Sequence, residues 1–279
     1  MTIRHVLQEG IFSLKEHSDT PFLDAAVLLA EVLNTTKEKV ITAFPEEISH
    51  EDLFIFRNFL EKRKSGIPVS YIRKKKEFWS LQFFVDERVL VPRPDTELLV
   101  ETALELAGAC TETCTLHDLC TGSGCVAISL KYSLPLLSVS ASDISADAGD
   151  VFAVNCGRIL GFQLPFYQSD LLSKVPGVFD IITANPPYLT TQEAGVMAGD
   201  GWPEPRAALD GGPGGLDFLA AIIQKAPERL NAGGILLLEA CPERMIFLHR
   251  IMSESGFSDI TVKKDLAGRD RVIKGTKAG

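Results

Sequence analysis

The sequence contains no long hydrophobic run. Its 279 residues include no stretch of about 18 consecutive apolar residues, the length that would indicate a transmembrane helix. The first ten residues also lack the apolar segment of a signal peptide, because Arg4, His5 and Glu9 interrupt them. From these absences we expect a soluble, cytoplasmic protein without a membrane partner.

The sequence also has no excess of positive charge. Lys and Arg number 28 against 37 Asp and Glu, which gives a formal net charge of −9. A protein that binds nucleic acid through its phosphates presents a cationic surface, so we expect no stable nucleic-acid binding. The six cysteines contain no Cys-x-x-Cys pair, which favours free thiols over a disulfide framework or a zinc site. We therefore expect no metal.

The sequence does have enough apolar material for a core, since 46% of its residues are hydrophobic. This composition excludes a disordered or low-complexity chain, and the length favours one large domain or two unequal ones. Asp24–Leu33 is rich in Ala, Leu and Val, and Ser49 with Asp52 forms a capping-box pattern before a helix that ends ahead of Gly66. These patterns predict a small helical domain over residues 1–72.

A linker is predicted over residues 73–94. Two extended segments, Glu77–Asp86 and Arg88–Pro92, flank a turn at Asp86 and Glu87. We expect them to form a β-hairpin.

From residue 95 to residue 279, helical stretches alternate with short apolar runs. The expected strands are Thr115–Leu119, Leu137–Ala141, Phe179–Thr183 and Gly234–Leu238. The expected helices are Asp95–Ala107, Gly124–Tyr132, Ser145–Leu160, Leu216–Leu230 and Pro242–Ser255. This alternation is typical of an α/β fold with a doubly wound, mostly parallel sheet. Two late runs, Ile260–Val262 and Arg271–Ile273, have no helix between them and predict an antiparallel edge.

A glycine loop follows the first of these strands, with the sequence Asp118-Leu-Cys-Thr-Gly-Ser-Gly124. Gly122 and Gly124 permit a tight turn close to a ligand, and the next helix offers unpaired N–H groups. Asp143 closes the next run, where a carboxylate can accept both hydroxyls of a ribose. The same residues fit the dinucleotide fingerprint of hydride-transfer enzymes, and a simple turn between strand and helix stays open at this point.

The tetrapeptide Asn185-Pro186-Pro187-Tyr188 follows the apolar run that begins at Phe179. Its prolines have no N–H, so the loop presents carbonyl acceptors and almost no donors. Asn185 adds a side-chain acceptor and Tyr188 a flat face. The complementary ligand is planar and carries an NH₂ group, as a carboxamide or an exocyclic base amine does. The alternative is a rigid turn in which Tyr188 packs on a proline.

With these motifs the chain resembles the release-factor glutamine methyltransferases (the HemK/PrmC family). They are class I S-adenosylmethionine-dependent methyltransferases that modify the Gly-Gly-Gln glutamine of class one peptide chain release factors. The resemblance also rests on residues 66–72, Val89–Glu97, Glu204–Leu209 and Lys264–Val272. It implies a Rossmann-like catalytic domain, a helical domain that recognises the release factor, and S-adenosylmethionine as cofactor.

Matched by position, the family's cofactor site falls on Asp118, Cys120, Thr121, Gly122, Ser123, Gly124, Asp143, Asp170, Leu171 and Asn185. The family's glutamine-binding and catalytic loop falls on Asn185, Pro186, Pro187 and Tyr188, with Arg93, Asp95 and Glu97 near the substrate. A helix start is the other interpretation of Asp95. Cys120 replaces the first glycine of the family's loop, so we expect a negative φ there. Leu171 replaces the aromatic residue that some relatives place over the adenine. Lys74 replaces a glycine that is usual in the family's linker.

Three other functions are weighed against glutamine methylation. An adenine exocyclic-amine methyltransferase would use the same acceptor loop on a flipped base, but the net charge of −9 argues against it. A nucleotide-binding scaffold without catalysis is a second alternative, because Cys120 departs from the glycine of the family's cofactor loop. A nicotinamide dehydrogenase is a third, although the Asn-Pro-Pro-Tyr loop has no role in hydride transfer.

Overall fold

The computed structural model describes residues 1–43, 45–109, 114–199 and 202–278. The chain divides into two compact units: residues 1–75 with residues 202–203, and residues 76–199 with residues 204–278. Among the described helices, none combines the length and the apolar composition that crossing a bilayer requires. Five cysteines are described and all are free, whereas Cys110 lies outside the described residues.

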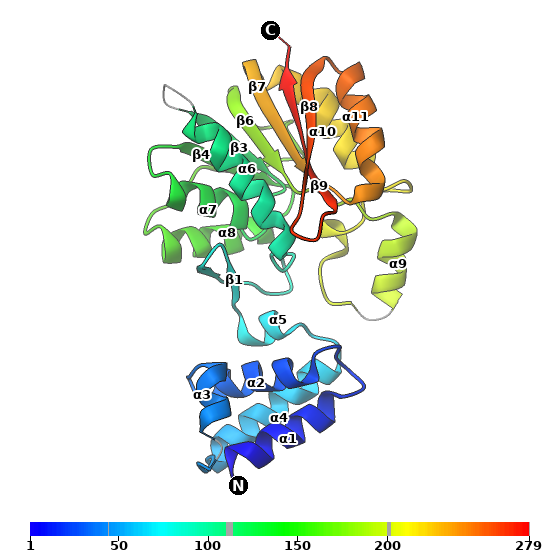
Figure 1. The fold of residues 1–279 in the computed structure, drawn as a ribbon. Coiled ribbons are helices and arrows are strands. Elements are labelled where there is room, and N and C mark those ends of the chain that lie inside the picture. Colours follow the sequence, from blue (N-terminus) through cyan, green and yellow to red (C-terminus); the bar gives the residue numbers. More distant parts are fainter. Residues whose placement is uncertain (44, 110–113, 200–201, 279) are drawn as a thin grey trace. The chain divides into compact units, whose positions relative to one another are not determined.

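The N-terminal unit consists of helices (Figure 1). They are α1 (Ile3–Leu14), α2 (Pro21–Val32), α3 (Lys37–Thr42), α4 (His50–Lys64) and α5 (Val69–Arg73). Pro21 occupies the first turn of α2, and the Ser49 hydroxyl caps α4 by accepting a hydrogen bond from Asp52 N at 3.0 Å. The apolar faces of α1, α2 and α4 form one core, in which Phe56 is fully buried. Lys74 forms the C-cap of α5 in the left-handed conformation (φ 54°).

A short hairpin opens the second unit. Its strands β1 (Lys76–Phe78) and β2 (Leu81–Phe83) pair antiparallel around Trp79 and Ser80, which both have positive φ. A hairpin does lie within the predicted linker, but its turn is at Trp79 and Ser80 rather than at Asp86 and Glu87. Tertiary contacts hold the turn instead, since the Trp79 indole donates to Ser133 Oγ at 2.9 Å and its backbone N–H donates to Glu97 at 2.8 Å.

The second unit is built on a seven-stranded sheet with the order β5-β4-β3-β6-β7-β9-β8. The strands are β3 (Thr115–Leu119), β4 (Ser138–Asp143), β5 (Phe166–Gln168), β6 (Phe179–Ala184), β7 (Leu230–Glu239), β8 (Phe257–Lys264) and β9 (Asp270–Lys277). The first five are parallel, and β9 runs antiparallel to both β7 and β8. The predicted fold class, including the antiparallel edge, is confirmed.

Helices cover both faces of this sheet (Figure 1). They are α6 (Glu97–Gly108), which follows the 3₁₀ turn η1 (Pro94–Thr96), then α7 (Cys125–Ser133), α8 (Ala146–Ile159), α9 (Thr191–Gly199), α10 (Asp217–Lys225) and α11 (Met245–Glu254). Further 3₁₀ turns are η2 (Arg206–Ala208), η3 (Ala226–Glu228) and η4 (Pro242–Arg244). The expected helix Leu216–Leu230 stops at Lys225, because Pro227 interrupts it. Neither the three-residue strand β5 nor α9 was predicted.

The strand order fixes where a ligand can bind. From β3 the chain proceeds outward through β4 and β5, and then returns to β6 on the other side of β3. At such a reversal the loops after neighbouring strands separate and leave a crevice beyond their carboxyl ends. The glycine loop follows β3 and the Asn-Pro-Pro-Tyr loop follows β6, so the topology brings the two motifs to this crevice.

Candidate active site

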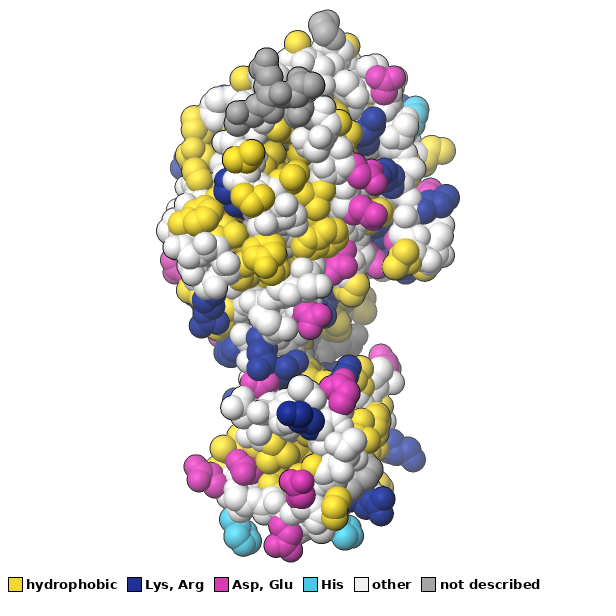
Figure 2. All heavy atoms as spheres, turned by 60° about the vertical axis from the view of Figure 1, so that its left-hand side comes forward, with side chains coloured by type: hydrophobic (Ala, Val, Ile, Leu, Met, Phe, Trp, Pro, Cys, Tyr) yellow, Lys and Arg dark blue, Asp and Glu magenta, His cyan; other side chains and the backbone are white. Residues whose placement is uncertain are grey.

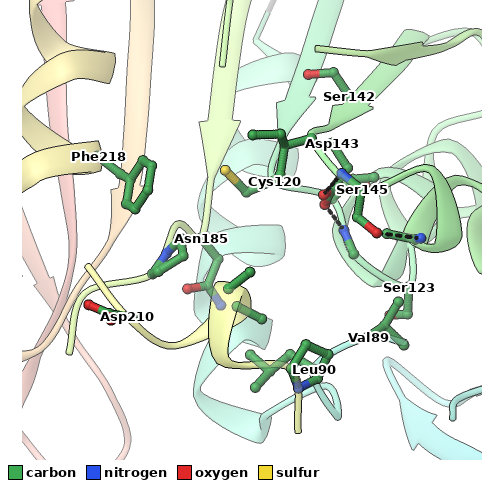
Figure 3. Close-up of a pocket in the computed structure, with 18 of the residues that line it drawn as sticks. Val89, Leu90, Cys120, Ser123, Ser142, Asp143, Ser145, Asn185, Asp210 and Phe218 are labelled. Atoms are coloured by element: carbon green, nitrogen blue, oxygen red, sulfur yellow. Dashed lines mark hydrogen bonds between the residues drawn. The ribbon is translucent and has the colours of Figure 1, made fainter. Parts of the chain in front are cut away.

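A cavity of about 690 Å³ lies at the carboxyl ends of β3, β4 and β6, a volume that suits a nucleotide-sized ligand. Figure 3 shows Cys120, Asp143 and Asn185 around this cavity. The predicted site residues that line it are Arg93, Asp118, Cys120, Thr121, Gly122, Ser123, Asp143, Asp170, Leu171, Asn185 and Pro187. Glu97, Gly124, Pro186 and Tyr188 are outside that lining.

The glycine loop contains a left-handed residue that is not glycine. Cys120 has a φ of 55°, so the expectation of a negative φ is wrong. Backbone contacts determine this geometry: Thr121 N donates to Ser142 O at 3.1 Å, and Gly124 N donates to Thr121 O at 2.8 Å. A left-handed conformation costs a residue with a Cβ about 1–2 kcal/mol. The loop therefore holds Cys120 in a conformation that carries local strain.

The two glycines of the loop have different roles. At Gly122 (φ 53°) an added Cβ would meet no atom within 4 Å, so the backbone faces open space in the cavity. At Gly124 (φ 81°) an added Cβ would come within 2.5 Å of the Phe152 ring and 2.8 Å of Ile128. Gly122 therefore leaves room for a ligand, whereas Gly124 allows the loop to pack against α7 and α8.

Asp143 connects the end of β4 to the glycine loop. Its Oδ2 accepts a hydrogen bond from Gly122 N at 2.9 Å, and its Oδ1 accepts one from Ser145 N at 3.0 Å (Figure 3). Burial raises the pKa of this carboxyl despite these hydrogen bonds. Each carboxylate oxygen has a second lone pair, so Asp143 can accept a ribose hydroxyl and hold the loop at the same time.

Asp118 lies beneath the loop and is 1% exposed. It accepts hydrogen bonds from Thr121 Oγ1 at 2.6 Å and from Thr183 Oγ1 at 2.7 Å. Burial raises its pKa to about 6. The cavity lining contains five carboxylates against three guanidinium groups: Asp118, Asp143, Asp170, Asp210 and Asp217 against Arg88, Arg93 and Arg206. This electrostatic environment favours a ligand with hydroxyl donors or positive charge.

Asp170 and Leu171 line the cavity just after β5. Leu171 has a φ of 46° and is 9% exposed, and its side chain belongs to the core cluster around β6 and β7. Leu171 therefore gives this side of the cavity an apolar surface.

The Asn-Pro-Pro-Tyr loop presents only part of itself to the cavity. Asn185 and Pro187 line it, Pro186 is buried, and Tyr188 packs against the core cluster. Burial raises the pKa of the Tyr188 phenol to about 12, so this group stays protonated. The Tyr188 ring is therefore partly buried against this cluster.

The amide of Asn185 has protein partners on its nitrogen. Its Nδ2 donates to Thr96 Oγ1 at 3.1 Å. The carboxyl of Glu239 lies beside this amide and the Thr96 hydroxyl, and both groups favour its ionised form. The Asn185 side chain lines the cavity, and its oxygen is the atom left to accept a donor there.

A glycine-rich loop braces the same motif from outside. Gly211 N donates to Leu189 O at 2.7 Å, and Leu189 N donates to Leu209 O at 3.1 Å. An added Cβ at Gly211 would come within 2.6 Å of Pro187 O, and one at Gly215 within 2.4 Å of Tyr188 O. The backbone after β6 is therefore packed against residues 209–215 so closely that only glycine fits.

Residues 93–97 hold several segments together. Arg93 forms an ion pair with the buried Glu204, and Glu97 accepts a hydrogen bond from Trp79 N at 2.8 Å. Asp95 forms ion pairs with Arg269 at 3.1 Å and Arg271 at 3.0 Å. These side chains already have partners within the unit, and of Arg93 and Glu97 only Arg93 reaches the cavity.

Sequence reasoning missed several residues that shape the site. Asn155, fully buried in α8, donates to Ser123 O at 2.8 Å and exchanges hydrogen bonds with the backbone of Phe84. Thr96, Thr183 and Glu239 were missed as well. Their partners are distant in sequence, so no local pattern indicates them. The glycines of residues 211–215 were the one available signal. Among the described residues, no cluster of His, Cys, Asp and Glu side chains could hold a metal ion.

Comparison with known proteins identifies the two parts of the chain. Residues 5–73 match the PrmC N-terminal domain, and residues 94–200 match the methyltransferase small domain. The release factor glutamine methyltransferase of Salmonella typhimurium is 36% identical over 280 residues, covering 99% of each chain. That of Clostridium acetobutylicum is 34% identical over 287 residues, covering 100% of each chain.

Solved structures agree with the fold. The catalytic domain of hMettl16, in complex with the MAT2A 3′UTR hairpin 6, aligns with a TM-score of 0.58 at 14% identity, covering 72% of this chain and 77% of that one. A methyltransferase from Pyrococcus furiosus aligns with a TM-score of 0.54 at 16% identity, covering 71% and 89%. From its full-length relatives, the chain belongs to the release factor glutamine methyltransferase (HemK/PrmC) family of class I S-adenosylmethionine-dependent methyltransferases.

Proposed function

We propose that this protein transfers a methyl group from S-adenosylmethionine to the side-chain amide nitrogen of the glutamine in the Gly-Gly-Gln segment of a class one peptide chain release factor. The observation that carries the proposal is the orientation of Asn185 at the cavity, with its nitrogen donating to Thr96 and the Glu239 carboxyl beside it. The side chain is then left with an acceptor for an NH₂ group.

The residues of the cavity fit the cofactor. Asp143 would bind the ribose hydroxyls, the backbone at Gly122 leaves open space beside it, and Asp170 with Leu171 would border the adenine. Asp118 adds negative charge to the wall that would face the cationic part of the cofactor. When bound, S-adenosylmethionine supplies a methyl group whose bond to sulfur breaks, leaving its electron pair on sulfur, while the amide nitrogen forms the new bond and releases one proton.

The protein's contribution is position and charge stabilisation. The amide nitrogen of glutamine is a weak nucleophile because its lone pair is delocalised. Asn185 Oδ1 would accept one of its two hydrogens, hold the nitrogen in line and stabilise the positive charge that grows on it. No strong base is needed at this step, and positioning alone can lower the barrier by roughly 7–11 kcal/mol.

The charge of the chain supports a basic protein partner. Residues 1–75 carry 11 Lys and Arg and 11 Asp and Glu, out of 28 and 37 in the whole chain, so the net charge of −9 belongs to residues 76–279. Figure 2 shows acidic, basic and hydrophobic side chains interspersed over the helical unit. A release factor binds ribosomal RNA and so has basic surface, which would be attracted to the acidic catalytic unit. We further propose that residues 1–72 recognise the factor's body, and that the reaction is cytoplasmic, as translation termination is.

Mass spectrometry tests the proposal directly. A release factor is incubated with the enzyme and S-adenosylmethionine, and its tryptic Gly-Gly-Gln peptide is examined for a gain of one methyl group. The expected result is methylation of the wild-type factor and none of a variant with Gln replaced by Ala in this segment. Absence of methylation from both, or transfer to adenine in an oligonucleotide instead, would overturn the proposal.

A further inference from the structure

We infer that Glu239, acting with Thr96, is a positioning residue that holds the side-chain amide of Asn185 in the one orientation that turns its oxygen toward the substrate. The inference rests on the proposed function, because it assumes that an NH₂ group of the substrate enters the cavity beside Asn185. Nothing in the resemblance or in the sequence motifs assigns a role to Glu239.

Strand register brings the two residues together. In the sheet, Ala184 at the end of β6 pairs with Leu238 of the parallel strand β7. Asn185 and Glu239 therefore leave the same edge of the sheet side by side. Thr96, the last residue of η1, contacts Asn185 there. The structure thus gathers three side chains that the sequence separates by more than half of the chain.

Hydrogen bonds then fix which way the amide faces. The Asn185 nitrogen donates to Thr96 Oγ1 at 3.1 Å, and the Glu239 carboxyl lies beside both side chains, which favour its ionised form. An amide has two donors on nitrogen and acceptor sites only on oxygen. Rotation by 180° would put the Asn185 oxygen against the Glu239 carboxyl and turn two donors toward the substrate's NH₂ group. The acceptor orientation is therefore strongly favoured.

The surroundings of Glu239 argue against a purely structural role. The residue is 1% exposed, and its Oε2 has no hydrogen-bond partner among the described residues. The charged groups that act on it are Arg271, which attracts it, and Asp95, which repels it. Arg271 forms its ion pairs with Asp95 at 3.0 Å and Asp265 at 3.4 Å. A buried carboxyl with one unsatisfied oxygen is costly for stability, and burial raises its pKa to about 7.

A matched pair of substitutions separates positioning from other roles. Glu239→Gln keeps a carbonyl oxygen that can accept from Asn185 and Thr96, whereas Glu239→Met has a similar length and no such acceptor. With the release factor as substrate, we expect Glu239→Met to lower kcat about 100-fold, the effect of losing one aligned electrostatic group. We expect Glu239→Gln to stay within about threefold of the parent, and both to bind S-adenosylhomocysteine as the parent does.

Each result decides the matter. If folded Glu239→Met keeps kcat within about threefold, the positioning role is wrong. If Glu239→Gln loses as much as Glu239→Met, the carboxyl takes part in the chemistry and positioning is again wrong. Should Glu239→Met not fold, Thr96→Val and Thr96→Ser make the same comparison. Valine matches threonine in shape without the hydroxyl, so it should lower kcat at least tenfold, while serine should restore it; equal rates in the two variants contradict the inference.

A measurement without release factor distinguishes this inference from the proposed function. The side-chain NH₂ resonances of Asn185, assigned by their loss in Asn185→Asp, report its hydrogen bonds in the free enzyme. We expect them to move in Glu239→Met and to stay in Glu243→Gln, which changes an exposed carboxyl nearby. Unmoved resonances in Glu239→Met overturn the positioning role. Shifted resonances in an enzyme that does not methylate the factor would refute the proposed function alone.

Discussion

The backbone N–H of Gly122 donates a 2.9 Å hydrogen bond to Asp143 Oδ2, and this contact ties the loop after β3 to the end of β4. Gly122 is also the loop residue whose missing side chain leaves the cavity open. One carboxylate therefore both shapes the cofactor pocket and offers acceptors to its ligand. Its removal should affect ligand binding more than folding.

We expect Asp143→Ala to weaken binding of S-adenosylhomocysteine about 10- to 100-fold. A hydrogen bond to a charged group contributes about 1.5–3 kcal/mol, and 1.4 kcal/mol corresponds to a factor of ten. Isothermal titration calorimetry gives the dissociation constant. Asp147→Ala, which removes an exposed carboxylate from the first turn of α8, is the control and should bind as the parent does. Equal affinities for all three proteins would contradict the role of Asp143.

Cys120 provides a test of backbone strain. Its φ of 55° is left-handed, so a residue with a Cβ is penalised there by about 1–2 kcal/mol and glycine is not. At ordinary positions glycine is the less stable choice, by about 0.5–1 kcal/mol relative to alanine. We expect the order to reverse here, with Cys120→Gly more stable than Cys120→Ala by about 1 kcal/mol in urea denaturation. If alanine proves the more stable, the loop is not held in the left-handed conformation.

The order of strands and helices in the second unit could be predicted from sequence because each element carries its own signal. The apolar runs at Thr115–Leu119 and Phe179–Thr183 are short and bounded by loop residues, and both became central parallel strands. The late runs after Ile260 lie in the antiparallel pair β8 and β9. Hydrophobic patterning of this kind depends on neighbours in sequence, so it can be recognised without knowledge of the fold.

Features that depend on tertiary contacts could not be predicted. Cys120 would have a negative φ in isolation, and only the contacts of its neighbours with β4 impose the opposite sign. The hairpin turn at Trp79 has no glycine or asparagine to indicate it. In the sequence, Glu239 is an ordinary glutamate at the end of a strand. Its position beside Asn185 becomes apparent only from the pairing of β6 with β7. Motifs locate the reacting loop, whereas the residues that orient it come from the fold.

The loop of residues 209–215 offers a prediction about the acceptor motif. An added Cβ at Gly211 would lie 2.6 Å from Pro187 O and 2.8 Å from Tyr188 Cα, both backbone atoms that cannot move independently. We expect Gly211→Ala to displace the motif, to lower stability by about 1–3 kcal/mol, and to reduce kcat at least tenfold. Thermal unfolding and single-turnover methylation measure the two effects.

Gly214 in the same loop is the matched control. An added Cβ there meets no atom within 4 Å, so Gly214→Ala should change stability by no more than about 0.5 kcal/mol and leave kcat unchanged. Similar behaviour of the two variants would show that residues 209–215 do not brace the motif.

The buried carboxyl of Glu239 predicts how stability depends on pH. Burial raises its pKa in the folded protein to about 7, from an ordinary value of 4.5. Between these values the folded state holds a proton that the unfolded state has released, so this group makes the free energy of unfolding fall as pH rises from about 4.5 to 7. Above pH 7 both states are ionised and the loss, on the order of 3 kcal/mol, is complete.

Glu239→Gln does not titrate and should escape this loss. We therefore expect the variant to gain stability relative to the parent as pH rises from 4.5 to 7, and the difference to level off beyond that. Asp118, whose pKa burial raises to about 6, is present in both proteins and cancels in the comparison. Urea denaturation at several pH values measures the difference. A difference that is constant across the range, or that favours the parent as pH rises, would mean that Glu239 is ionised throughout and is stabilised by Arg271.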